Sequence, residues 1–150
     1  MAQAKIVKND IIINAPAAIV WDTLVNPAKT KQYMFNCETV SDWQPGSELL
    51  WKTVYEGQEL VAVKGTIEEI VPGERLVYTT IDPNSTIDDT SENYLKVTYQ
   101  LSPKDGQTLL EVSQGDYSTV AEGDRRYQEA MAAGGWSSIL TEIKKVAEAN

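Results

Sequence analysis

Turn-forming residues recur at short intervals through the middle of this sequence. They occur as Pro45-Gly46, Glu56-Gly57, Pro72-Gly73, Asp82-Pro83-Asn84 and Lys104-Asp105-Gly106. Such residues favour tight reversals of the chain, and the segments between them alternate apolar and polar side chains with the period of a strand. The pattern therefore predicts an antiparallel meander of six strands, near 36–42, 48–56, 59–71, 75–82, 92–102 and 107–116.

The residues before the meander predict one strand followed by two short helices. Residues 5–14 are rich in β-branched side chains and end at Ala15-Pro16, which is typical of a strand. Proline suits the first turn of a helix, so the segment 16–25, with apolar residues at helical spacing, is the first expected helix. Asn26-Pro27 repeats the signal and predicts a second helix that runs to about Met34.

The C-terminal segment has the apolar period of a helix. Tyr127, Met131, Gly135, Ile139 and Ile143 are spaced by four, which predicts one helix over about 124–148. At 1.5 Å per residue it would span roughly 37 Å, enough to cross the whole sheet. The pair at 134–135 should cost about 1 kcal/mol per glycine relative to alanine. Close packing or a kink explains that cost, and the alternative is space left for a ligand.

Alternation along the expected strands identifies the covered face of the sheet. The side chains of Trp51, Thr53 and Tyr55 alternate with the charged Lys52 and Glu56, so the former are expected on the covered side. In the next strand Val61, Val63, Gly65 and Ile67 are expected inward, and Val97 and Val112 farther along. The candidate residues for the wall of a cavity are Trp51, Tyr55, Val63, Gly65, Ile67, Tyr78, Tyr99, Leu110, Met131, Gly135 and Ile139. Trp136 is favoured as a core residue, and for Trp51, Tyr55 and Tyr78 a place in the core is the alternative to the cavity wall.

Three local patterns carry a family resemblance that covers nearly the whole chain. They are residues 13–16 with Trp21 and Leu24, residues 65–78 (GTIEEIVPGERLVY), and Gly135-Trp136 with Leu140. The sequence resembles the START and birch-pollen-allergen-like (SRPBCC) superfamily, in the branch related to the activator of the ninety-kilodalton heat-shock protein's ATPase. The resemblance implies an α+β helix-grip fold over residues 1–150. In that fold a seven-stranded curved antiparallel sheet wraps around a long C-terminal helix and encloses a cavity for apolar molecules.

Charge and composition exclude several kinds of partner. The chain has 13 basic and 22 acidic residues, a formal charge of −9, and no basic stripe that could neutralise successive phosphates. We therefore expect neither nucleic acid nor an anionic membrane surface as a partner. No apolar run reaches the length of a membrane span, and the first residues lack the pattern of a signal peptide. We expect a soluble cytoplasmic protein.

The sequence also carries little of the usual chemistry of active sites. It has no histidine and one cysteine, Cys37, so the common metal sites and nucleophile triads are not expected. No phosphate-binding glycine loop is present, and no cofactor is predicted. The polar stretch Asp82 to Asn93 is expected to be a mobile, solvated loop, or alternatively a lid over the cavity.

These observations favour a protein that binds or carries a small apolar molecule, as a monomer or homodimer. A domain that contacts a chaperone is the first alternative. The second is an enzyme that acts on an apolar substrate through a tyrosine or a buried carboxylate, because burial can raise the pKa of an acid into a useful range.

Overall fold

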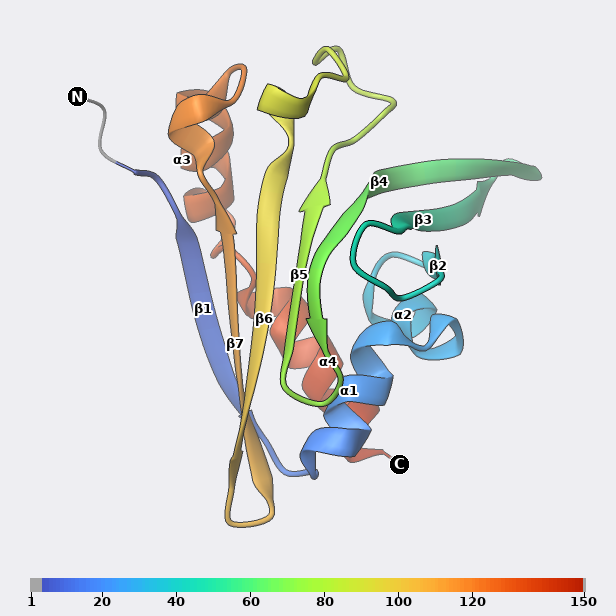
Figure 1. Cartoon of the computed structure of the whole chain (residues 1–150), viewed down its shortest axis with the longest axis vertical. Coiled ribbons are helices and arrows are strands. Elements are labelled where there is room, and N and C mark those ends of the chain that lie inside the picture. Colours follow the sequence, from blue (N-terminus) through green and yellow to red (C-terminus); the bar gives the residue numbers. More distant parts are fainter. Residues whose placement is uncertain (1–3, 150) are drawn as a thin grey trace.

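The computed structural model describes residues 4–149. Seven antiparallel strands form one curved sheet in the spatial order β1-β7-β6-β5-β4-β3-β2 (Figure 1). The helix-grip fold is confirmed, and the strands begin and end within a few residues of the expected positions. They are β1 (Val7–Ile13), β2 (Glu38–Ser41), β3 (Glu48–Tyr55), β4 (Gln58–Val71), β5 (Arg75–Thr80), β6 (Leu95–Lys104) and β7 (Gln107–Gly115).

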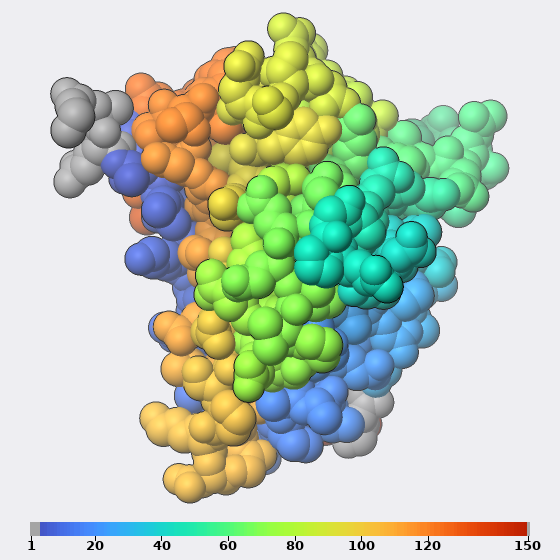
Figure 2. All heavy atoms as spheres, in the orientation of Figure 1, coloured from blue at the N-terminus to red at the C-terminus, as the bar shows by residue number. Residues whose placement is uncertain are grey.

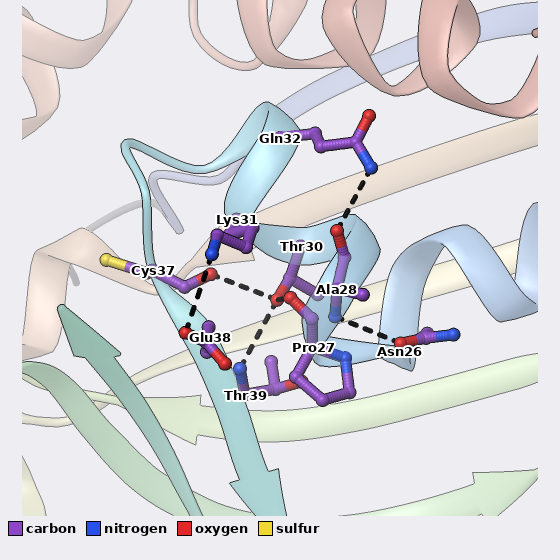
Figure 3. Close-up of polar contacts among 9 residues, drawn as sticks. All are labelled: Asn26, Pro27, Ala28, Thr30, Lys31, Gln32, Cys37, Glu38 and Thr39. Atoms are coloured by element: carbon purple, nitrogen blue, oxygen red, sulfur yellow. Dashed lines mark hydrogen bonds and ion pairs between the residues drawn. The ribbon is translucent and has the colours of Figure 1, made fainter.

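Two short helices follow the first strand, as the two prolines indicate. They are α1 (Ala17–Val25) and α2 (Pro27–Tyr33). Proline takes the first position of α2, and the side chain of Asn26 accepts a hydrogen bond from the backbone N–H of Ala28 at 3.0 Å (Figure 3). This cap satisfies one of the free N–H groups at the helix start.

The prediction of one long C-terminal helix is wrong, because the helix breaks at the glycine pair. The two parts are α3 (Gly123–Ala132) and α4 (Ser137–Glu148). Gly134 and Gly135 have φ of 86° and 63°, a left-handed conformation that glycine adopts without steric cost. After the break, α4 passes behind the sheet in the view of Figure 1 and packs against β1 and α1.

Close packing against β1 explains why glycine is needed at this break. A Cβ atom on Gly135 would lie 2.5 Å from Oδ1 of Asn9 and 2.7 Å from Cγ1 of Val7. That same Oδ1 atom accepts a hydrogen bond from the backbone N–H of Trp136 at 2.9 Å, and Nδ2 of Asn9 donates to the carbonyl of Gly134 at 3.3 Å. The side chain of Asn9 therefore holds the bend on the first strand.

The β3–β4 ribbon extends beyond the rest of the sheet and stands out from the body of the molecule (Figures 1 and 2). Within it, Trp51 pairs with Val63 and Lys52 pairs with Val61, which leaves Ala62 as the extra residue of a β-bulge. A bulge shifts the alternation of side chains by one residue and bends the strand. As a result the part of β4 before the bulge follows a different alternation from the part after it.

Candidate functional site

A cavity of about 400 Å³ lies between the covered face of the sheet, the α3–α4 bend and the segment that follows α2. This volume is within the usual range of small-molecule sites. Its wall is mostly apolar, and among the described residues, 4–149, no Asp, Glu, Lys or Arg side chain lines it. The site is therefore built to surround an uncharged surface.

Strand register forms the sheet wall of the cavity. Tyr78 on β5 pairs with Val97 on β6, Val97 pairs with Gln114 on β7, and Gln114 pairs with Val7 on β1. Directly paired residues point to the same face of a sheet, and all four of these side chains line the cavity. They form a continuous row across four neighbouring strands.

A series of aromatic rings connects this wall to the helix break. The ring centroids of Trp51 and Tyr78 are 6.3 Å apart, and those of Tyr78 and Tyr99 are 5.8 Å apart. The rings of Tyr99 and Trp136 meet edge to face, with centroids 5.8 Å apart and an interplanar angle of 87°. Aromatic pairs at these separations add stabilisation beyond the apolar area that they bury. The rings give the cavity a rigid side.

The segment after α2 forms part of the opposite wall, and Thr30 fixes its path (Figure 3). The buried hydroxyl of Thr30 donates to the carbonyl of Cys37 at 3.0 Å and accepts from the backbone N–H of Thr39 at 3.2 Å. Met34, Phe35 and Cys37 line the cavity. The side chain of Phe35 is 78% exposed, which places it at the mouth.

Two polar side chains on the sheet wall are oriented by buried aromatic partners. The hydroxyl of Tyr78 is 3.1 Å from that of Tyr99, and Oε1 of Gln114 accepts from Nε1 of Trp136 at 3.0 Å. Burial raises the pKa of Tyr78 well above its usual value, and the neighbouring Tyr99 adds to the increase. Burial also raises the pKa of the Cys37 thiol. Both groups therefore keep their protons at neutral pH.

The structure brings five of the predicted wall residues together around the cavity. These are Trp51, Val63, Tyr78, Gly135 and Ile139. They come from three strands and the α3–α4 region, which are far apart in the sequence. Their part in ligand binding stays a prediction. Trp136, expected in the core, is 7% exposed. It belongs to the core cluster and also lines the cavity.

Three more of the predicted residues lie in the solid core. Ile67, Tyr99 and Leu110 have 0% exposure and do not reach the cavity. Gly65 also lies outside it, because a Cβ atom there would be 1.6 Å from the carbonyl oxygen of Thr79. The missing side chain at Gly65 therefore lets β4 approach the backbone of Thr79 on β5 closely, and it does not provide space for a ligand.

The remaining two predicted residues face solvent. Tyr55 is 66% exposed because it is the last residue of β3, at the tip of the protruding ribbon, so its expected covered position is wrong. Met131 is 51% exposed. Its neighbour Ala130 lines the cavity instead, and successive residues of a helix point about 100° apart.

Several lining residues were not among the predicted ones. The bulge places Ala62 on the wall beside Val63, whereas Val61, which alternation places inward, does not line the cavity. Thr80 and Gln114 also line the cavity, from the covered face of their strands. They were not predicted because their side chains are polar. Strict alternation from the neighbouring inward residues Tyr78 and Val112 was the signal that could have found them.

The loop of residues 82–93 is tied to the body of the protein. The amide of Asn84 donates to the carbonyl of Val61 at 2.8 Å, and Lys64 forms an ion pair with Asp89. Asn93 accepts from the backbone N–H of Ala121 at 3.0 Å. None of these loop residues lines the cavity, so the loop does not form a lid in this structure.

Among residues 4–149, no three or more His, Cys, Asp or Glu side chains come together in a group that could hold a metal ion. Over the same range, none of the helices combines the length and apolar character needed to cross a bilayer.

Comparison with known proteins supports the fold and identifies the family. The family model described as "Activator of Hsp90 ATPase homolog 1-like protein" matches residues 14–148. The solution structure of ChR145 from Cytophaga hutchinsonii is 32% identical, with a TM-score of 0.74 and coverage of 98% of this chain and 97% of that one. No curated protein matches the sequence significantly.

More distant structures share the fold alone. NE0264 from Nitrosomonas europaea is 17% identical, with a TM-score of 0.72 over 99% of this chain and 97% of that chain. The Aha1 dimer from Colwellia psychrerythraea is 14% identical, with a TM-score of 0.69 over 95% of this chain and 96% of that chain. Together with the family match, these results show that the chain belongs to the Activator of Hsp90 ATPase homolog 1-like family, within the START and birch-pollen-allergen-like superfamily.

Proposed function

We propose that this protein binds and carries a small apolar molecule in the cavity between the sheet and the α3–α4 bend. The observation that carries the proposal is the cavity of about 400 Å³, whose wall is mostly apolar and, among residues 4–149, includes no charged side chain. Leaving such a space open forgoes the packing contacts that a solid core would gain. A ligand that fills it restores those contacts.

The same site gives little support to catalysis. A general base needs a pKa near the working pH and must lie within reach of the substrate. In the part of the chain that the structure describes, no carboxylate side chain lines the cavity, and burial keeps Tyr78 and Cys37 protonated by raising the pKa of each. The wall therefore offers contacts that bind a ligand more readily than groups that transform one.

A contact role with a chaperone is the second candidate, and the family match supports it. The surface that suits it best is the tip of the β3–β4 ribbon, where Val54 and Tyr55 are 68% and 66% exposed. Apolar side chains that stand out together from a protein surface are typical of protein contacts. This role does not need the cavity.

One experiment separates the two functions. The tagged protein is isolated from an extract of its own cells and measured by mass spectrometry under native and denaturing conditions. We expect a small molecule of defined mass that is bound in the native spectrum and released on denaturation. A protein without a bound small molecule but in a defined complex with an ATPase chaperone would contradict the carrier function and support the contact role.

A further inference from the structure

The hydrogen bond between Tyr78 and Tyr99 determines which polar atom meets the cavity. Tyr99 has 0% exposure and lies outside the cavity wall, whereas Tyr78 lines the cavity. If Tyr78 were the donor in their 3.1 Å contact, the proton of Tyr99 would be buried without an acceptor, which is costly. Tyr99 is therefore the better donor, and this direction leaves the proton of Tyr78, the residue of the pair that lines the cavity, available to a ligand.

Gln114 is oriented in the same way by a second buried aromatic residue. Its Oε1 atom accepts the indole N–H of Trp136 at 3.0 Å. The side chain lies on the cavity wall, and within residues 4–149 no hydrogen bond is formed by its amide nitrogen. The two N–H donors of the amide are therefore the part that a ligand meets.

The two donors lie in one row of the sheet. Tyr78 and Gln114 are both paired with Val97, on either side of it, so their Cα atoms are two strand spacings apart, or about 10 Å. Both side chains line the cavity, on either side of Val97. A ligand that lies against Val97 therefore has one donor on each side of it.

Charge excludes ionised ligands from the same place. From Lys5 to Glu148, the first and last charged residues that the structure describes, no basic side chain lines the cavity to pair with an anion, and no acidic one lines it to pair with a cation. Burying an unpaired charge costs far more than two neutral hydrogen bonds return. The formal charge of −9 on the chain adds to the penalty for an anion.

We propose that the ligand of this cavity is a neutral, mainly apolar molecule with a carbonyl-type acceptor oxygen, held by the hydroxyl of Tyr78 and the amide of Gln114. The inference rests on the proposed function and adds the chemical class of the ligand. It assigns specificity to two residues that otherwise resemble ordinary wall residues. A hydrocarbon of the same shape leaves both donors unpaired, and an acid of that shape brings an unpaired charge.

The test compares three flat probes of similar size, which are fluorene, 9-fluorenone and fluorene-9-carboxylate. Dissociation constants are measured from chemical-shift changes in titrations of the labelled protein. We expect 9-fluorenone to bind at least about fivefold more tightly than fluorene, because the ketone gains a neutral hydrogen bond. It should also bind about tenfold more tightly than the carboxylate, because the carboxylate brings an unpaired charge into the cavity.

Variants connect this preference to the two side chains. Tyr78→Phe and Gln114→Met should each reduce the ketone-to-hydrocarbon ratio, and the double variant should bring it below about twofold, because each change removes a donor and keeps the shape. The matched control is Tyr33→Phe, which deletes a buried hydroxyl that donates to the carbonyl of Leu24 outside the cavity, and it should keep the ratio. Each ratio is calculated from two dissociation constants of the same variant, so a loss of stability in that variant affects both constants and leaves their ratio interpretable.

Each outcome has a definite meaning. Equal binding of fluorene and 9-fluorenone, tighter binding of the carboxylate, or an unchanged ratio in both cavity variants would overturn the assignment of ligand class while leaving apolar binding intact. Absence of binding by all three probes, together with a protein that carries no small molecule from cells, would overturn the proposed function itself. A ketone-to-hydrocarbon ratio that is smaller in each cavity variant than in the wild-type protein supports the proposal.

Discussion

Adding a phenyl ring to each of two facing walls, in the variant Ala62→Phe/Ala130→Phe, is expected to weaken binding of the neutral dye Nile red at least about tenfold, or about 1.4 kcal/mol. Both alanines line the cavity, one from the sheet and one from α3. The added rings occupy the space that a ligand needs. The measurement is a fluorescence titration, in which the dye brightens as it leaves water.

The matched control places the same rings on outward positions of the same two elements. Thr66 on β4 and Ala132 on α3 are exposed and lie outside the cavity wall, so Thr66→Phe/Ala132→Phe should keep the affinity of the wild-type protein. Thermal unfolding of both variants checks their folding. Unchanged dye binding by the folded cavity-filled variant would show that the dye binds elsewhere and would remove this support for the cavity.

Stability is expected to fall steeply with pH above about 10, the ordinary pKa of tyrosine. Burial raises the pKa values of Tyr33, Tyr78 and Tyr99 in the folded protein. In the unfolded chain these phenols lose their protons near pH 10, whereas in the folded protein they keep them, so the unfolded state binds fewer protons. The stabilisation is fully present below pH 10 and is lost as the pH rises from there towards the folded-state pKa values.

The expected slope is large because three groups act together. Each contributes about 1.4 kcal/mol per pH unit, which gives about 4 kcal/mol per unit in that range. Urea unfolding at closely spaced pH values measures it. Tyr33→Phe should reduce the slope by about 1.4 kcal/mol per pH unit. An unchanged slope in this variant would contradict the assignment of the slope to buried phenols.

Local signals in the sequence were sufficient to predict the sheet and the two N-terminal helices. Turn pairs such as Pro72-Gly73 mark positions where the chain must reverse, and proline after Asn26 marks a helix start. Both act through backbone geometry that depends on a few neighbouring residues. Predictions that rest on such short-range effects agree with the structure.

The cavity wall was harder to predict because it depends on contacts between distant residues. Gly135 was recognised as unusual, but the break in the helix is explained by Asn9 and Val7, which are more than one hundred positions away in the sequence. The bulge at Ala62 likewise comes from the pairing of two strands. Alternation along one strand cannot reveal such shifts.

The same limit explains the error at Tyr55. Alternation places it on the same side as Trp51, which is 4% exposed, but the ribbon has left the body of the sheet by that point. A pattern of side chains shows which way a residue faces and does not show whether another element covers it. Ile67 and Leu110 show the converse, since they face the covered side where the core is solid.

The central claim is that an apolar space, open to small molecules, lies between the sheet and the broken C-terminal helix. Crystals of the protein pressurised with xenon test it directly, because xenon enters apolar cavities of this kind without requiring a specific chemical partner. We expect xenon peaks in contact with Trp51, Tyr78 and Val97. A structure in which side chains fill this region and xenon is absent from it would contradict the account.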